Sequence, residues 1–260
     1  MTEAVKVKEH WDKMAQSMGK AQQATHGDIH LRALEIEAIQ KYLKDGRIID
    51  VGCGNGYSTL KFAKELPNSS FLGVDYSEEM LEYARTAKAE SNTENVEFEF
   101  LDITQEVPYK LCNQFDIAVT ERCLINLTSH EAHLTGLINL GKLVKPGGLL
   151  CLSEESIQAY NRINDLRKSA GLSDMTIQWH NLYLDLDRLI QELPSDLEYI
   201  GADDFSSSYY LGTRFYKAYF YENQGLDPAA DVTGDFNRLA AQIPPMGDYG
   251  LLNLFLFKKK

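Results

Sequence analysis

Short apolar runs alternate with helical patterns between residues 47 and 155. The runs are rich in β-branched and aromatic side chains and end at glycine or polar residues, which is typical of buried strands. In chain order they are RIIDV, FLGVD, VEFEF, FDIAVT and LLCLSE. Apolar residues at helical spacing fill the intervals and predict helices over 57–66, 77–90 and 129–143. This repetition predicts a parallel sheet with helices on both faces.

Further elements flank this region. Additional helices are expected over 3–18, 29–43, 156–170 and 184–193, and additional strands over 197–205 and 249–257. Asp28 is the expected N-cap of the second helix, because its side chain can accept a bond from a backbone N–H of the first turn. The predicted fold class is α/β, with a doubly wound, mostly parallel sheet of seven strands.

The pattern divides the chain into four parts. They are an N-terminal helical lid over 1–46, a ligand-binding α/β domain over 47–205, an inserted lid segment over 206–248, and the final strand with a basic tail over 249–260. The inserted part is much longer than a hairpin loop and is expected to help cover the site. Lys258, Lys259 and Lys260 form the only basic run, and we expect a solvated tail there.

Charge and composition narrow the range of partners. The 260 residues carry 26 Lys and Arg against 38 Asp and Glu, a formal net charge of -12. A polyanion is repelled by this surface unless a local basic patch exists, and the sequence has none, so no nucleic-acid partner is expected.

The cysteines and the apolar segments of the chain favour a cytoplasmic location. Cys53, Cys112, Cys123 and Cys151 lack metal-ligand spacing, which favours buried free thiols and no metal. The first residues lack an apolar signal core, and LLNLFLF is too short to span a bilayer. A cytoplasmic location without a membrane partner is the expectation.

A glycine-rich turn in IIDVGCGNGYSTLKFA is the strongest local motif. Gly52, Gly54 and Gly56 stand between a strand and a helix, where glycine permits positive φ and a close approach to a ligand. A dinucleotide-binding turn of the form G-x-G-x-x-G requires glycine where this chain has Tyr57. The motif therefore disfavours a nicotinamide cofactor.

Two later strands also end in carboxylates. Asp75 closes FLGVD, where an acidic side chain can accept bonds from ribose hydroxyls, although it could instead cap the helix that begins at Ser77. Asp102 and Ile103 follow VEFEF and place a carboxylate beside an apolar pair, a slot that suits adenine.

The order of these motifs resembles the class I S-adenosylmethionine-dependent methyltransferase superfamily. The resemblance covers about residues 47–155, from the acidic strand end and G-x-G-x-G to KPGG before the fifth strand. It implies a Rossmann-like methyltransferase with S-adenosyl-L-methionine as cofactor and S-adenosyl-L-homocysteine as product. By this resemblance the methionine end is held by Asp50 and Gly52, the ribose by Asp75, the adenine by Asp102 and Ile103, and the sulfur is flanked by Thr120 and Glu121. The same segments supply the other cofactor candidates Cys53, Gly54, Asn55, Gly56, Tyr76 and Met80.

Methyl transfer requires alignment of the nucleophile with the methyl group and removal of a proton from a hydroxyl acceptor. Acceptor groups should follow the fourth and fifth strands, where the sequence places Glu121, Arg122, Glu154 and Glu155. Arg122 can clamp a carboxylate or phosphate of the acceptor, or it can pair with a neighbouring glutamate.

The stretch WHNLY also suits an acceptor. It supplies Trp179, Asn181 and Tyr183 as binding candidates and His180 as the candidate general base, although a histidine beside tryptophan can equally be a packed surface residue. The inserted segment adds Tyr209 and Arg214, and the N-terminal lid adds His26. Each of these is a binding candidate with a structural alternative.

The strings ERCLINL, WHNLY and SSSYYLGTR resemble parts of bacterial methyltransferases associated with sugars and surface polysaccharides. This resemblance implies a small-molecule acceptor, a sugar or nucleotide-linked sugar, methylated on oxygen or nitrogen. Methylation of protein or nucleic acid is a second hypothesis, although the chain lacks an N-P-P-Y signature after the fourth strand. A module that binds the cofactor without catalysis is a third, and the oligomeric state is left open.

Overall fold

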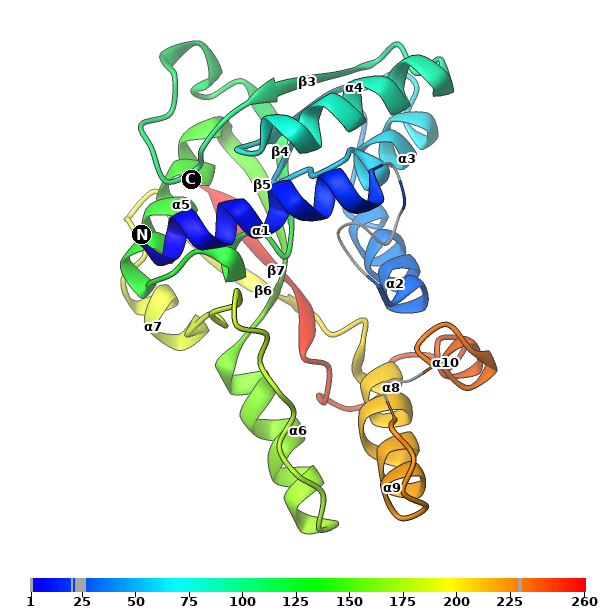
Figure 1. Ribbon diagram of the computed structural model, residues 1–260. Coiled ribbons are helices and arrows are strands. Elements are labelled where there is room, and N and C mark those ends of the chain that lie inside the picture. Colours follow the sequence, from blue (N-terminus) through cyan, green and yellow to red (C-terminus); the bar gives the residue numbers. More distant parts are fainter. Residues whose placement is uncertain (1, 20, 22–26, 229–230) are drawn as a thin grey trace.

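A computed structural model describes residues 2–19, 21, 27–228 and 231–260 of the chain (Figure 1). Its centre is a seven-stranded sheet in the order β3-β2-β1-β4-β5-β7-β6. The strands are β1 (Arg47–Val51), β2 (Ser70–Asp75), β3 (Val96–Phe100), β4 (Phe115–Glu121), β5 (Val144–Glu155), β6 (Leu197–Asp203) and β7 (Leu252–Lys259). β7 runs antiparallel to both of its neighbours, and the pairs among β1 to β5 are parallel. The predicted doubly wound, mostly parallel sheet is confirmed.

The helices follow the predicted pattern with small changes at their ends. They are α1 (Glu3–Met18), α2 (Ile29–Gln40), α3 (Tyr57–Glu65), α4 (Glu78–Ser91), α5 (His130–Leu143), α6 (Ile157–Ser169), α7 (Leu186–Gln191), α8 (Ser207–Tyr210), α9 (Lys217–Glu222) and α10 (Asp235–Ala240). A π-helical turn over Leu211–Tyr216 joins α8 to α9. Asp28 caps α2 as expected and accepts a bond from Leu31 N at 3.2 Å.

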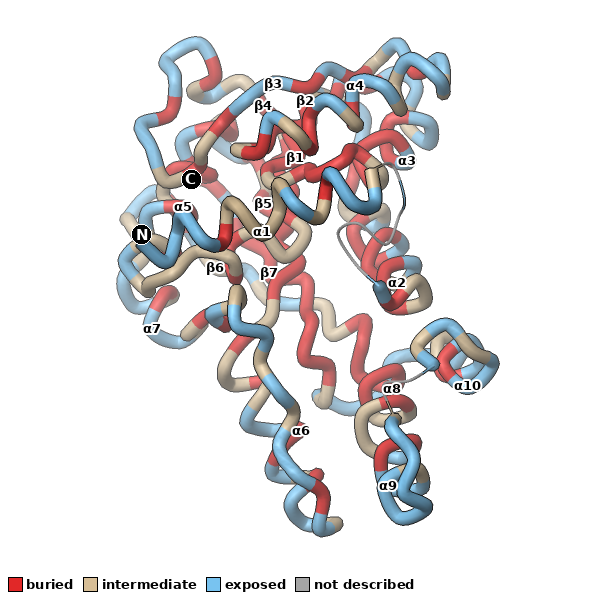
Figure 2. Tube along the Cα trace, in the orientation of Figure 1, coloured by how far each residue is buried: buried red, intermediate tan, exposed pale blue. Residues whose placement is uncertain are grey.

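The sheet is buried on both faces. Ile48 and Ile49 of β1, Val119 of β4 and Leu150 of β5 are fully buried, which explains why these strands are continuous apolar runs. Figure 2 shows the buried residues gathered along the sheet, whereas the outer faces of the surrounding helices are exposed. The strand order reverses between β1 and β4, and ligands of doubly wound sheets bind beside such a point.

α1 is fixed to the loops at the carboxyl ends of the strands. Trp11 Nε1 donates to Asn126 Oδ1 at 3.1 Å, beyond β4, and Ser77 Oγ donates to Asp12 Oδ1 at 2.6 Å, beyond β2. Asn55 Nδ2, beyond β1, donates to the carbonyl of Gly19 at 3.0 Å. The first helix therefore covers the edge of the sheet where a ligand is expected.

The C-terminal lysines differ from the expected solvated tail. Lys258 and Lys259 belong to β7, and Lys260 N donates to Asp196 O at 2.9 Å. Lys259 is buried, with Nζ donating to Asn113 Oδ1 and to the carbonyl of Gly141, both at 2.8 Å. Pairing of β7 with β5 and β6 orders the chain to its last residues.

α6, α8 and α9 extend from the sheet on the side away from β3 (Figure 1). In the described part of the chain, no helix combines the length and apolar character needed to cross a membrane. No cluster of three or more His, Cys, Asp or Glu side chains among the described residues is arranged to hold a metal ion.

Candidate active site

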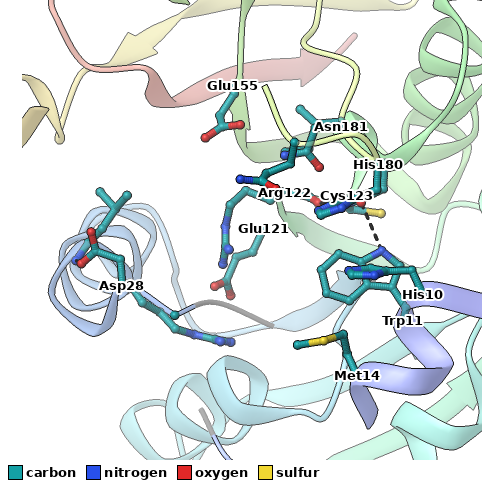
Figure 3. A pocket seen from close by; sticks show the side chains of 18 of the residues that line it. His10, Trp11, Met14, Asp28, Glu121, Arg122, Cys123, Glu155, His180 and Asn181 are labelled. Atoms are coloured by element: carbon teal, nitrogen blue, oxygen red, sulfur yellow. Dashed lines mark hydrogen bonds between the residues drawn. The ribbon is translucent and has the colours of Figure 1, made fainter. Parts of the chain in front are cut away.

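A cavity of about 630 Å³ lies at the carboxyl ends of the parallel strands (Figure 3). Its walls come from α1, the start of α2, the loops after β1, β2, β4 and β5, the loop over 175–183, and Tyr210 and Arg214 of the inserted segment. The volume is in the range of small-molecule and cofactor sites.

The glycine-rich turn forms one side of this cavity. Gly52 has φ 78°, and a Cβ at this position would lie 2.6 Å from Cys123 Sγ. Gly54 lines the cavity, whereas Gly56 begins α3 behind it, where a Cβ would lie 2.7 Å from Phe98 Cζ. Only glycine fits at positions 52 and 56, because a Cβ there would meet Cys123 or Phe98 at less than van der Waals distance.

Asp75 is buried and lines the same side of the cavity together with Tyr76 and Met80. Its Oδ2 accepts from Gly54 N at 2.8 Å and its Oδ1 from Ser77 N at 2.9 Å, so the carboxylate is fixed. The N-cap of α4 is Ser77 itself, not Asp75. Burial raises the pKa of Asp75, and the bonds from Ser77 and Gly54 oppose that rise.

Asp50 lines the cavity, and its buried carboxylate is incompletely bonded. Thr59 Oγ1 donates to its Oδ2 at 2.5 Å, and its Oδ1 is buried without a hydrogen-bond partner among the described residues. Burial raises the pKa of Asp50 to about 6. A buried acceptor of this kind suits a ligand that donates hydrogen bonds, such as the ammonium of a methionine group.

Five of the predicted cofactor residues lie outside the walls of this cavity. They are Asn55, Gly56, Asp102, Ile103 and Thr120. Asn55 binds the chain after α1, and Thr120 Oγ1 donates to Glu154 Oε1 at 2.7 Å. Asp102 Oδ1 accepts from the backbone and hydroxyl of Thr104. The side chains of Asn55, Asp102 and Thr120 thus bond to neighbouring loops, whereas Ile103 belongs to the hydrophobic core and Gly56 precedes α3.

A buried network of charges lies behind the loop after β4. Arg122, at φ 55°, donates from Nε and Nη2 to the two oxygens of Glu35 at 3.3 and 3.0 Å. Ser58 Oγ donates to Glu121 Oε2 at 2.9 Å and accepts from Arg32 Nη2 at 3.2 Å. Burial, reinforced by Glu35, raises the pKa of Glu121 to about 8. Arg122 is thus matched by a carboxylate that the sequence did not associate with it.

The adjacent carboxylates of β5 have different surroundings because alternate residues of a strand face opposite sides. Glu154 is fully buried and accepts from Thr120 Oγ1 and from the backbone N–H groups of residues 123, 124 and 125. Glu155 faces the cavity (Figure 3). Burial raises the pKa of Glu155 to about 7, and the charge of Arg122 and a hydrogen bond from Tyr183 oppose the rise.

An aromatic cluster forms the wall on the side of α1. The rings of His10 and His180 are stacked with centroids 4.5 Å apart, and Trp11 meets His180 edge-on at 5.4 Å. Trp179 packs edge-on against both imidazoles but is 57% exposed and does not line the cavity. Burial lowers the pKa of His180 to about 4, so its ring is neutral at pH 7.

The inserted segment forms part of the cavity wall and is hydrogen-bonded to Asp28 at the start of α2. Arg214 Nη2 donates to Asp28 Oδ2 at 3.0 Å, and Tyr209 OH donates to Asp28 Oδ1 at 2.6 Å. Arg214 lines the cavity, whereas Tyr209 is buried behind it and accepts from Asn237 Nδ2 at 2.8 Å. Asn181 and Tyr183 also line the cavity, and His26 lies outside the described residues.

Several cavity and network residues were not predicted as site residues. They are His10, Trp11, Met14, Asp28, Arg32 and Glu35. A signal existed for three of them, because Asp28, Arg32 and Glu35 follow one another at helical spacing among the apolar residues of α2. Charged side chains on an otherwise apolar helix face indicate buried partners.

The comparison with known families agrees with this geometry. Residues 43–192 match the family model of a methyltransferase domain. The chain belongs to the class I S-adenosylmethionine-dependent methyltransferases. The predicted enzyme class and the predicted cofactor, S-adenosylmethionine, are confirmed.

Relatives of this methyltransferase share only part of its length. It is similar to an uncharacterized methyltransferase of Schizosaccharomyces pombe, with 35% identity over 45% of this chain and 43% of the relative. A carboxy-S-adenosyl-L-methionine synthase of Desulfotalea psychrophila is 29% identical over 54% of this chain and 60% of that protein. The chain thus spans about half the length of these curated relatives.

The fold is also found in solved structures. A phosphoethanolamine N-methyltransferase of Haemonchus contortus, bound to phosphoethanolamine and S-adenosylhomocysteine, aligns with a TM-score of 0.62 at 15% identity. The alignment covers 100% of this chain and 50% of that one. At this identity the similarity concerns the fold alone.

Proposed function

We propose that this methyltransferase transfers the methyl group of S-adenosylmethionine to an oxygen or nitrogen of a small molecule. The observation that carries the proposal is a single cavity that joins the glycine-rich turn to the side chains after β4 and β5. Helix α1 and the inserted segment add walls that a bare sheet edge lacks. A walled cavity suits a small acceptor better than a macromolecule, and the net charge of -12 disfavours nucleic acid.

The cofactor is assigned to the side of the cavity formed by β1 and β2. Asp75 is proposed to hold the ribose hydroxyls, and Gly52 and Gly54 allow the backbone to approach the cofactor. The unpartnered Oδ1 of Asp50 suits the methionine ammonium. Arg32 also lines the cavity, and its guanidinium suits the methionine carboxylate. Cys53, Tyr76 and Met80 are proposed as contacts of the adenosine.

The acceptor is assigned to the opposite side of the cavity. Asn181, Tyr183, Arg214 and Arg122 line it and are proposed as binding or positioning groups. Trp179 and Tyr209 are proposed to support this side from behind. A base is most effective when its pKa is near the working pH, so the value of about 4 assigns His180 to the wall of the acceptor site, not to proton removal.

The main task of these residues is to align the acceptor atom with the methyl group of the cofactor. Bound S-adenosylmethionine would supply an electrophilic methyl group, and the residues of the acceptor side would hold the acceptor atom in line with the carbon–sulfur bond. Glu121 ends β4 and lines the cavity, and its side chain is proposed to lie beside the sulfonium. A sugar acceptor, suggested by the sequence resemblance, supplies hydroxyls that fit this polar lining.

Calorimetric titration with S-adenosylmethionine, S-adenosylhomocysteine and NADH tests the cofactor assignment. We expect both adenosyl compounds to bind, NADH not to bind, and Asp75→Ala to lower adenosyl affinity at least about tenfold, or about 1.4 kcal/mol. Asp116→Ala, a half-buried strand carboxylate paired with Lys145 and outside the cavity, is the matched control. Unchanged affinity in Asp75→Ala would refute the proposed cofactor site.

A screen for methylated products then tests the acceptor class. The enzyme is incubated with labelled S-adenosylmethionine and a panel of sugars, amines, peptides and RNA. Transfer to a small molecule is expected. Transfer to peptide or RNA alone would contradict the proposal.

A further inference from the structure

The acceptor side of the cavity is not electrically balanced. Each guanidinium that lines it already has a carboxylate partner. Arg122 is held by both oxygens of Glu35, whose side chain is 0% exposed, and Arg214 is held by Asp28, whose side chain is 6% exposed. An anionic acceptor would compete with these buried carboxylates for the charge of the two guanidinium groups, and separating a buried ion pair is strongly unfavourable.

Arg32, the third cavity guanidinium, lies on the cofactor side. It shares Ser58 with Glu121, and that carboxylate is among the charges that favour its protonated form. The acceptor side therefore lacks a guanidinium whose charge is not already compensated by a carboxylate of the described residues.

Glu155 is the carboxylate in excess. It ends β5, and the carbonyl of Glu155 accepts from Leu184 N at 2.9 Å, so the strand end and the loop carrying Tyr183 are joined. Tyr183 donates to the Glu155 carboxylate, and the phenol of Tyr210 lies close to both groups. Arg122 is near, and its Nε and Nη2 donate to Glu35.

The contrast with Glu154 indicates that this excess charge serves a ligand. Glu154 has four hydrogen bonds from the described residues, and these hold the turn after β4. The Glu155 carboxylate instead lines the cavity, as Figure 3 shows. A carboxylate on a cavity wall, fixed by a phenol on one side, has further lone pairs for donors of a bound molecule.

We propose that Glu155 binds the nucleophilic hydroxyl or amine of the acceptor and takes its proton, and that the acceptor is neutral or cationic rather than phosphorylated. This inference rests on the proposed methyl transfer to a small molecule. In the step, a lone pair of the acceptor oxygen or nitrogen forms the new bond to the methyl carbon. The electrons of the carbon–sulfur bond remain on sulfur, and the proton of the nucleophile passes to the Glu155 carboxylate and then to water.

The acid–base properties of the site are compatible with this role. Burial raises the pKa of Glu155 to about 7. Near neutral pH the side chain can therefore exist as the carboxylate that accepts a proton and as the acid that releases it. The charged and titratable groups that act on it are Arg122 beyond β4, Glu35 of α2, Glu154 of β5, Tyr183 of the 175–183 loop and Tyr210 of α8.

Three sugars of one skeleton and different charge test the inference without knowledge of the natural acceptor. Glucosamine, glucose and glucose 6-phosphate are titrated into protein saturated with S-adenosylhomocysteine, and binding is measured by ligand-observed NMR. We expect glucosamine to bind at least about tenfold more tightly than glucose 6-phosphate. In Glu155→Gln this preference should fall about tenfold, and in the control Glu198→Gln, an exposed carboxylate of β6, it should be unchanged.

The outcomes separate the two proposals. Calorimetry of S-adenosylhomocysteine with Glu155→Gln should give the wild-type affinity, which shows that the variant is folded. Tighter binding of glucose 6-phosphate, equal or absent binding of all three sugars, or an unchanged preference in Glu155→Gln would overturn the inference. Failure of wild-type protein to bind S-adenosylhomocysteine would refute the proposed function itself.

Discussion

Gly52 lies on the proposed cofactor side of the cavity, at a position that only glycine can occupy. Its φ of 78° and the 2.6 Å that would separate an added Cβ from Cys123 Sγ are two separate obstacles to any side chain. Gly52→Ala should therefore lower the affinity for S-adenosylmethionine at least about tenfold and destabilise the fold by about 1–3 kcal/mol. Calorimetry and urea unfolding measure the two effects.

Gly147 provides the matched control for this substitution. It has φ 81°, but a Cβ there would have no atom within 4 Å. Gly147→Ala should show the backbone strain without the loss of cofactor affinity. Equal affinity losses in the two variants would mean that contact with Cys123 does not matter.

Glu121 should influence how stability depends on pH. Its pKa is raised to about 8 in the folded protein, so the folded state binds more protons than the unfolded state above the ordinary glutamate pKa. The resulting stabilisation is complete at low pH and is lost as pH rises through about 8. Glu121→Gln should therefore flatten the fall of unfolding free energy between about pH 5 and pH 8, measured by urea unfolding at several pH values.

The control for this prediction is Glu97→Gln, an exposed carboxylate of β3 paired with Lys88. It should leave the pH dependence as in the wild type. A Glu121→Gln profile parallel to that of the wild type would show that the folded protein keeps this carboxylate ionised.

At the scale of elements, α1 is a covering helix held at defined points. Asn55 Nδ2 donates to the carbonyls of Gly19 and Ala21, both at 3.0 Å, and so fixes the end of this helix. Asn55→Ala should speed amide hydrogen exchange over 3–18 and weaken cofactor binding only a few-fold, because Asn55 does not line the cavity. Exchange detected by mass spectrometry, with calorimetry, measures both.

The same experiment separates this role from the cofactor contact that the family resemblance implies for Asn55. A cofactor contact would give a large loss of affinity with unchanged exchange in α1. Trp11→Phe is the companion variant, since it removes the 3.1 Å bond to Asn126 while keeping an aromatic ring in the wall, and it should also speed exchange in α1.

At the scale of the whole molecule, Asp28 joins the N-terminal segment to the insertion before β7. Tyr209 OH and Arg214 both donate to it across 181 and 186 positions of sequence. Tyr209→Phe removes one donor to Asp28 and one acceptor of Asn237 in a buried place, so we expect a loss of about 1–3 kcal/mol in unfolding free energy. Tyr109→Phe, at a side chain 94% exposed, should change stability little. Equal stability of the two variants would contradict a structural role for this junction.

The sequence by itself determined the order and type of the elements and the position of the cofactor motif. Apolar periodicity depends on which face of a strand or helix is buried, and this signal lies within a few consecutive residues. The caps are equally local, so Asp28 was placed correctly before α2. The glycines at 52, 54 and 56 were identifiable because their conformational requirement is also local.

Only the tertiary structure decided which charges meet in the cavity. Arg122 pairs with Glu35 across 87 positions, and Asp28 pairs with Arg214, so neither arginine presents an uncompensated charge to an acceptor. The different roles of Glu154 and Glu155 likewise follow from what packs on each side of β5. The C-terminal lysines became part of a strand for the same reason. Such partners are distant in sequence, and their pairing depends on strand order and on the path of the insertion, which periodicity does not encode.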